Sequence, residues 1–183
     1  MMKALLATIA LCVLSSNVVW AEDKSEPQDG HARVRFFGQA AIGMTFYKNQ
    51  TCYGGHGVEA SRTGLGGLFG SKKNISLGIP ETPNVTNLKA RDGILAAAFY
   101  REYSLNSGEP LTILASYKET TGRTGYSCTY SPSVFFTPEN GQDYEVVLDV
   151  NDQCRLSVKR IELKEAVIQL MPVELAEAKK CPG

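Results

Sequence analysis

The residues of this chain best suited to covalent chemistry are its cysteines, and four of them follow residue 21: Cys52, Cys128, Cys154 and Cys181. A thiol can serve as a nucleophile, a metal ligand or half of a disulfide. The Cys-x-x-Cys spacing typical of redox and zinc sites is absent. An even number of cysteines in an exported chain instead favours disulfides, with three connectivities open. We expect Cys128–Cys154, which flank a predicted hairpin, and therefore Cys52–Cys181.

Histidine offers the next chemistry, and the chain has only His31 and His56. Cys52 and His56 together could bind a metal ion, but a structural zinc site usually needs four ligands. A serine or cysteine nucleophile needs a histidine that a third group holds in place, and only His56 lies well inside the predicted domain. We therefore expect no catalytic residue, metal site or cofactor. The alternative is a secreted hydrolase or small-ligand-binding protein that uses His56.

Three carboxylates lie on one face of a predicted strand: Asp143, Glu145 and Asp149. Paired carboxylates can perform general acid–base catalysis. Acids that alternate with apolar residues along a strand are more often solvated, and no neighbouring residue indicates the burial that would separate their pKa values. The sequence predicts a surface role for all three.

A glycine-rich segment, Gly54–Gly70, holds seven glycines in 17 residues. It lacks the Gly-Lys-Ser/Thr order of a phosphate-binding loop, and its flanks do not show the strand-then-helix context. Glycine loses much backbone entropy on ordering, which predicts a long surface loop. Because loops on a rigid scaffold often carry function, this loop and the lysines after it are the predicted contact surface. Its candidate binding residues are His56, Leu65, Leu68, Phe69, Lys72 and Lys73.

The N-terminus has the pattern of a cleavable signal peptide over residues 1–21. Lys3 is followed by the apolar run Ala4–Leu14, and Val19-Trp20-Ala21 predicts cleavage before Glu22. Cys12 then falls inside the apolar run, and no membrane anchor remains after cleavage. Loss of Lys3 leaves 18 basic and 19 acidic residues, a formal charge of −1. That charge, without a basic run, argues against nucleic acid as a partner.

Residues 22–31 predict a disordered leader, and residues 32–183 a single domain. From Ala32 the chain alternates between polar and apolar residues, which predicts strands with one face in a core and one in water. Ile42, Met44 and Phe46 share one such face. We expect a short strand at 74–79 and a strand at 111–117, whereas 94–103 is compatible with a helix or a strand.

The C-terminal half predicts further short strands at 126–130, 133–136, 143–150 and 154–163, which include an Asn-Gly turn at 140–141. Tyr144, Val146, Leu148 and Val150 should face inward, and Leu156, Val158 and Ile161 should form one apolar face. Residues 174–180 predict a short helix. Many short strands separated by turns indicate a mainly β fold, an antiparallel β-sandwich with a long Gly-rich loop.

The segment Phe135-Phe136-Thr137-Pro138-Glu139-Asn140-Gly141-Gln142-Asp143-Tyr144-Glu145-Val146 joins an apolar strand, a Pro/Gly turn and a Tyr-x-Val strand. It resembles a recurrent pattern of PEGA-like β-sandwich proteins of the bacterial cell envelope, and residues 103–112 are similar. The resemblance covers about 50 residues. It implies a β-sandwich and an envelope location, and it implies no single activity. The chain departs from lipoprotein members in lacking an acceptable lipidation cysteine.

Together these observations predict an exported, non-enzymatic β-sandwich in the periplasm or outside the cell. We expect it to bind another envelope or extracellular protein, in the manner of an inhibitor or immunity protein, through the Gly-rich loop.

Overall fold

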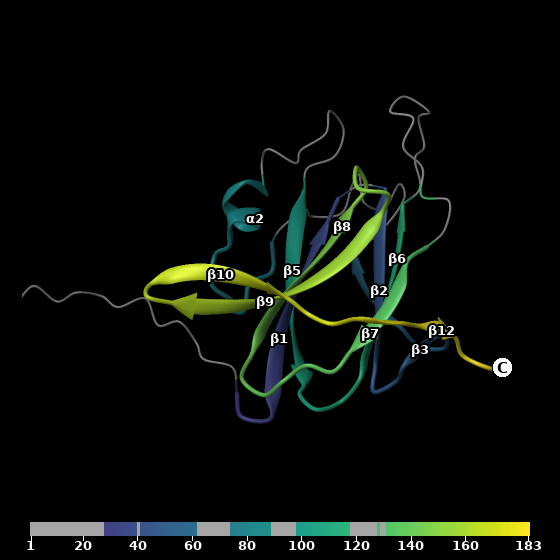
Figure 1. Ribbon diagram of the computed structural model, residues 1–183. Coiled ribbons are helices and arrows are strands. Elements are labelled where there is room, and N and C mark those ends of the chain that lie inside the picture. Colours follow the sequence, from purple (N-terminus) through teal and green to yellow (C-terminus); the bar gives the residue numbers. More distant parts are fainter. Residues whose placement is uncertain (1–27, 40, 62–73, 89–97, 118–127, 129–130) are drawn as a thin grey trace, which may run out of the picture.

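The computed structural model describes residues 28–39, 41–61, 74–88, 98–117, 128 and 131–183. Two five-stranded sheets pack against each other (Figure 1). Sheet A contains, in spatial order, β10 (Val167–Pro172), β9 (Arg155–Lys164), β8 (Asp143–Asp149), β1 (His31–Gly38) and β5 (Phe99–Asn106). Sheet B contains β11 (Ala176–Glu177), β7 (Ser133–Phe136), β6 (Leu111–Tyr117), β2 (Ile42–Lys48) and β4 (Val58–Ser61). The remaining described elements are β3 (Cys52–Tyr53), β12 (Lys179–Lys180) and the short helix α2 (Pro83–Thr86).

The predicted mainly β sandwich is confirmed, with one detail that the strand pattern does not reveal. Neighbouring strands within the two sheets pair antiparallel except β1 and β8, which run parallel. β1 starts at His31, and the chain just before it is tied down, since Gly30 donates its N–H to the side chain of Asn140.

The core between the sheets follows the predicted alternation. Ile42, Met44 and Phe46 of β2 are at most 4% exposed, and Tyr144, Val146 and Leu148 of β8 at most 2%. The ring of Phe36 stacks on that of Phe46 at 5.1 Å between centroids, which joins the two sheets. Strand periodicity was sufficient to find these residues, because side chains two positions apart share a face.

The other face of sheet A is covered where β1, β5 and β8 lie, which corrects the prediction of a solvated face for Arg33, Arg35, Asp143 and Glu145. These four polar side chains are buried, with Arg35 at 1% and Glu145 at 0% exposure. Residues 74–86, which we call the strap, contact this face and include α2. Alternation shows which residues share a face, but it does not show whether a distant segment covers that face.

The predicted helix at 174–180 is wrong. This segment forms β11, which pairs with β7, and β12, which pairs with β3. The N–H of Cys181 donates to the carbonyl of Tyr53, and the Cys52–Cys181 disulfide fixes the tail beside β3. Pairing with distant strands overrides the local helix propensity of these residues.

Three further strand predictions need correction. Residues 58–61 within the predicted loop Gly54–Gly70 form β4, and residues 62–70 lie outside the described chain. The predicted strand at 74–79 is reduced to one bridge between Ile75 and Arg101. Ile161 pairs with Asp143 whereas Val158 pairs with Val146, so Ile161 lies on the outer face of β9.

Two predicted segments lie partly outside the described residues, and one strand of the structure was not predicted. The ambiguous region at 94–103 is a strand where it is described, since β5 starts at Phe99. Of the predicted strand 126–130, only Cys128 lies within the described residues. Strand β10 was not predicted at all, and it forms a hairpin with β9 through a turn at Glu165 and Ala166.

Both predicted disulfides are present. Cys128–Cys154 has a Cα–Cα distance of 5.6 Å and Cys52–Cys181 one of 5.1 Å. The predicted hairpin between Cys128 and Cys154 is wrong, because β7 and β8 lie between these cysteines in different sheets and do not pair. The bridge instead links the chain before β7 to the start of β9, with Cys154 in the core. Structural disulfides of this kind are typical of oxidising compartments outside the cytoplasm.

Candidate functional site

The predicted binding residues lie largely outside the described chain. Leu65, Leu68, Phe69, Lys72 and Lys73 belong to residues 62–73. His56 is described, and it is exposed at a bend between β3 and β4. Cys52, its proposed partner in a metal site, is bonded to Cys181 and has no free thiolate. The structure therefore does not bring His56 and Cys52 together as ligands.

The chain around His56 is shaped by close packing against sheet B. A Cβ on Gly57 would lie 2.4 Å from the Cγ2 atom of Thr45 and 2.7 Å from the ring of Tyr47. Only glycine lets the backbone pass this close to β2. This glycine has a packing role, and it does not mark a ligand site.

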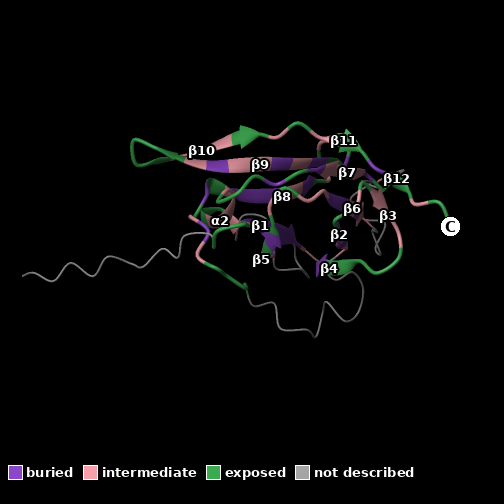
Figure 2. Ribbon diagram, turned by 90° about the horizontal axis from the view of Figure 1, so that it is seen from below, coloured by how far each residue is buried: buried purple, intermediate pink, exposed green. Residues whose placement is uncertain are grey.

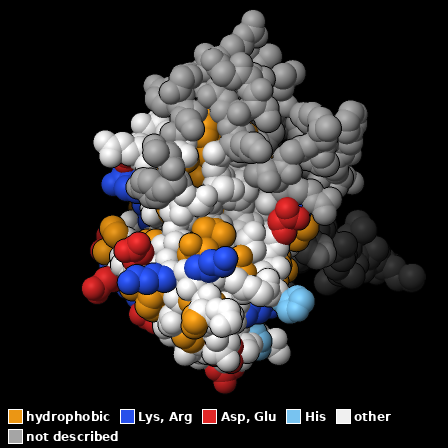
Figure 3. Space-filling view, turned by 90° about the vertical axis from the view of Figure 1, so that its right-hand side faces the viewer, with side chains coloured by type: hydrophobic (Ala, Val, Ile, Leu, Met, Phe, Trp, Pro, Cys, Tyr) orange, Lys and Arg blue, Asp and Glu red, His pale blue; other side chains and the backbone are white. Residues whose placement is uncertain are grey.

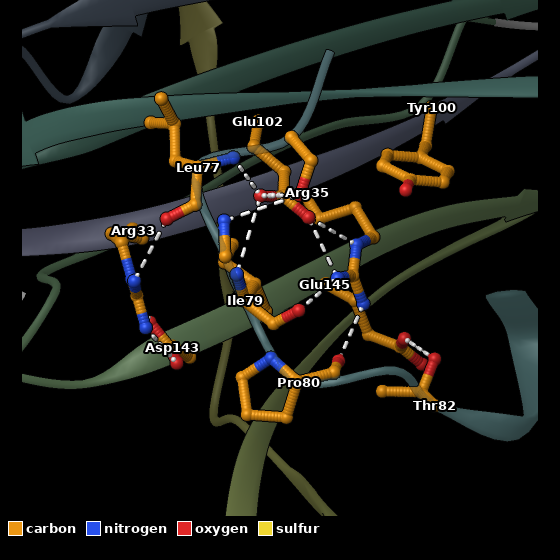
Figure 4. A network of polar contacts seen from close by, with 12 residues as sticks. Arg33, Arg35, Leu77, Ile79, Pro80, Thr82, Tyr100, Glu102, Asp143 and Glu145 are labelled. Atoms are coloured by element: carbon orange, nitrogen blue, oxygen red, sulfur yellow. Dashed lines mark hydrogen bonds and ion pairs between the residues drawn. The ribbon is translucent and has the colours of Figure 1, made fainter. Parts of the chain in front are cut away.

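A buried network of charges forms the most elaborate polar site among the described residues, on the outer face of sheet A (Figure 4). Strand β1 supplies its two cations. Arg35 lies opposite Glu102 of β5 and opposite Glu145 of β8 in the strand registers, while Arg33 lies opposite Asp143. Directly opposite residues on neighbouring strands share a face, so the sheet itself brings these charges together.

Arg35 and Glu102 form the centre of the network. The guanidinium of Arg35 donates from Nε and Nη2 to Oε1 of Glu102 at 2.9 and 2.6 Å. It also donates to the carbonyls of Ile79 and Pro80 in the strap, at 2.7 and 3.0 Å. The ring of Tyr100 lies 5.0 Å from the guanidinium carbon and adds a cation–π contact.

The strap backbone satisfies the other carboxylate oxygen of Glu102. Its Oε2 atom accepts the N–H groups of Leu77 and Ile79 and the hydroxyl of Ser76. Carboxylates and guanidinium groups of the sheet thus bind both the donors and the acceptors of one extended segment. An unpaired backbone group under such cover would cost roughly 1–3 kcal/mol.

The remaining charges of this network have similar structural partners. Arg33 pairs with Asp143 through two hydrogen bonds of 2.7 and 2.8 Å and donates to the carbonyl of Leu77 at 3.0 Å. Glu145 accepts the hydroxyl of Thr82 at 2.7 Å and the side-chain amide of Asn84. These groups hold the strap, and their hydrogen bonds leave them poorly suited to acid–base chemistry on a substrate.

The surface prediction for the three β8 carboxylates is therefore correct only for Asp149. Asp149 is exposed and accepts the N–H groups of Asn151 and Asp152 in the following turn. Asp143 and Glu145 are buried in the network. The signal that could have indicated this is the pairing of two arginines on β1 with acids spaced the same way on β8.

A hollow of about 290 Å³ lies on the opposite, core-side face of sheet A, near the start of the β9–β10 hairpin. It is lined by Tyr144, Arg160 and two acids, Glu139 and Glu174, among others. Arg160 is bound to Glu162 and Glu139, so the cation is already neutralised. Burial raises the pKa of Tyr144 above its ordinary value of 10.0, and the phenolic oxygen accepts the N–H of Glu139.

The β9–β10 hairpin itself is the most exposed apolar element of the described chain. It projects beyond the layered body, and its end is exposed (Figures 1 and 2). Leu163 is 62% and Val167 61% exposed, while Met171 is 38% exposed. On the outer face, Leu163 lies opposite Ile168 and Ile161 opposite Leu170. Ile161 is only 6% exposed, whereas Leu163 is open to solvent and Ile168 and Leu170 are partly exposed. We call Leu163, Ile168 and Leu170 the hairpin patch.

Charges surround this hairpin without favouring one sign. Lys164 and Arg160 hold the pKa of Glu162 below its usual range, through hydrogen bonds to its carboxylate. On another side of the molecule, the one that carries β12, basic, acidic and hydrophobic side chains are also interspersed (Figure 3). Neither surface has the single-signed field that attracts a polyelectrolyte.

Among the described residues, no three His, Cys, Asp or Glu side chains are arranged to hold a metal ion. In the same part of the chain, no helix has the length and apolar character needed to cross a membrane. No protein-family model matches the sequence, and no curated protein matches it.

Proposed function

We propose that this protein is exported to the periplasm or the cell exterior, where it binds another protein without catalysing a reaction. The observation that carries the proposal is the hairpin patch on a disulfide-stapled sandwich, in which Leu163 is 62% exposed and Ile168 and Leu170 are partly exposed. Contiguous exposed apolar surface marks sites of protein interaction more often than chance surface does. The signal-peptide pattern of residues 1–21 and the resemblance to PEGA-like envelope proteins support the compartment.

The hairpin suits this role because it is both rigid and accessible. Its ladder runs without a register shift from Lys164 and Val167 to Lys159 and Pro172. Leu163 at the end needs no rearrangement to reach a partner, and a preordered contact loses little conformational entropy on binding. An inhibitor or immunity protein would present such a hairpin to a cleft of its target.

The segment 62–73 is the second candidate contact surface, on the strength of its sequence. Deletion of residues 57–70 would be a poor test, because it removes Ala60 and Ser61 of β4, which are 0% and 1% exposed. Substitution is the cleaner approach, with Leu65→Ser and Phe69→Ser made together.

Affinity capture from envelope extract and culture fluid of the source cells tests both surfaces. The baits are the mature protein, the Leu163→Ser variant, the 65/69 double variant and a matched control. Val58→Ser is that control, since Val58 is also an exposed apolar residue on a strand, at 38% exposure. We expect Leu163→Ser to lose the captured partner and Val58→Ser to retain it.

The other outcomes are equally informative. Loss with the 65/69 variant alone would move the contact surface to residues 62–73. Retention by all variants, or a failure of the mature protein to capture any partner, would reject the proposal that either surface binds a protein.

A further inference from the structure

Strand β10 exposes an edge of sheet A that no described strand covers. In an antiparallel hairpin, alternate residues direct their N–H and C=O groups toward the partner strand. Val173 donates to the carbonyl of Val158, which places the odd-numbered residues of β10 on the β9 side. The N–H and C=O groups of Ile168 and Leu170 therefore point outward, along the open edge.

The opposite edge of sheet A shows how this protein protects a strand. There both backbone groups of Ile75 in the strap bond to β5. Its N–H donates to the carbonyl of Tyr100 at 3.1 Å, and its carbonyl accepts the N–H of Glu102 at 2.9 Å. Within the part of the chain that the structure describes, β10 has no charged side chain, no bulge and no covering segment, and its one guard is the proline at its end. Its residues are Val-Ile-Gln-Leu-Met-Pro, and only Pro172 at its end lacks a donor.

We propose that two copies of this chain pair through β10, antiparallel, with Gln169 on the two-fold axis. In this register Ile168 of one copy exchanges both of its backbone hydrogen bonds with Leu170 of the other, and the symmetric pair does the same. A strand edge that meets its own copy in this way makes a closed, isologous contact.

The side chains of β10 are self-complementary in the same register. On the outer face, Ile168 lies beside Leu170 of the second copy. On the other face, Val167 lies beside Met171 of the second copy, and these two side chains are 61% and 38% exposed in the single chain. The two Gln169 side chains meet at the axis, where amides can hydrogen-bond to each other. No charge is buried and no like charges are opposed within the strand.

The pairing goes beyond the proposed function because it uses the backbone edge, whereas partner capture uses the hairpin patch. It joins the two five-stranded sheets A into one continuous sheet. Both hairpin patches then lie on the same face of that sheet, side by side, so a target would meet a doubled apolar surface.

Cysteine crosslinking of the oxidised mature protein tests the register. Gln169 faces its copy across a non-hydrogen-bonded pair with Cα atoms about 4.5 Å apart, within the range of about 4.4–6.8 Å for disulfides. Gln169→Cys should give a covalent dimer linked through residue 169. Val167→Cys is the matched control, because the two copies of residue 167 lie about 13 Å apart and should not crosslink. Equal crosslinking of both variants, or of neither, would overturn the proposed register.

Sedimentation equilibrium over a wide concentration range tests the association itself. The mature protein should rise toward twice its monomer mass, and Ile168→Pro should remain monomeric. That proline removes an outward N–H and leaves the ladder to β9 intact, which circular dichroism and unfolding curves verify. A monomeric parent protein, or a dimer that persists in Ile168→Pro, would contradict the proposal. The capture experiment with Leu163→Ser is read separately, so each proposal can fail without the other.

Discussion

Arg35 and Glu102 form an ion pair whose closest N–O distance is 2.6 Å and whose side chains are 1% and 0% exposed. Such a pair contributes little net stability compared with two apolar residues, because desolvation of both charges offsets their attraction. The role of this pair is geometric, since the same two groups bind the backbone of Leu77, Ile79 and Pro80. The pair fastens the strap to the sheet.

Removal of one member of this ion pair should destabilise the fold. Arg35→Met or Glu102→Gln leaves a buried charge without its partner and should lower the free energy of unfolding by about 3–5 kcal/mol. The double variant should lose less than the sum of the two. Urea denaturation measures all three. Arg155→Met is the control, since the Arg155–Asp152 pair is 72% and 48% exposed and should contribute less than about 1 kcal/mol. Equal losses for Arg35→Met and Arg155→Met would contradict this account.

The two disulfides should stabilise the fold unequally. Cys128–Cys154 closes a separation of 26 residues and Cys52–Cys181 one of 129. By loop entropy the first contributes about 3.5 kcal/mol and the second about 5 kcal/mol. Paired Cys→Ala substitutions, compared by chemical unfolding without reductant, measure both contributions. A larger loss for the 128/154 pair would show that core packing of Cys154 outweighs the entropy of the longer loop.

Stability should fall at alkaline pH because of Tyr144. Burial raises the pKa of this phenol above 10.0, so between the unfolded and the folded pKa the native state keeps a proton that the unfolded state has lost. The stabilising contribution is therefore complete below pH 10 and is lost as the pH rises through the folded pKa. Tyr144→Phe should flatten the alkaline part of a plot of unfolding free energy against pH. An unchanged slope would assign the loss to other groups.

Substitutions in the turn of the β9–β10 hairpin should raise the stability of the fold. Glu165 and Ala166 have φ values of 50° and 63°, a conformation in which non-glycine residues are strained. Two-residue hairpin turns of this kind favour Asn-Gly. Glu165→Asn with Ala166→Gly should raise the free energy of unfolding by about 1–2 kcal/mol, as measured by thermal or urea unfolding. Lys164→Asn, just before the turn, is the control and should give no gain.

The same turn explains why the sequence did not predict β10. The Asn140-Gly141 pair predicts a turn by its composition. Glu165-Ala166 carries no such signal, because these residues prefer helix to a left-handed turn. Pairing along the whole β9–β10 ladder imposes the turn on them. The helix prediction for residues 174–180 is wrong for the same reason, since the strands that pair with this segment, β7 and β3, lie far away in the sequence.

The sequence by itself determined the sheet-forming periods, the inward-facing residues of β2 and β8, and the even number of cysteines after residue 21. These depend on side-chain alternation and on the number of thiols, which are local or countable properties. Only the tertiary structure decided that Arg35 and Glu145 are buried, that the tail is a strand and that β10 has an open edge. Each of these depends on which distant segment lies against a given face or edge, and alternation carries no information about that neighbour.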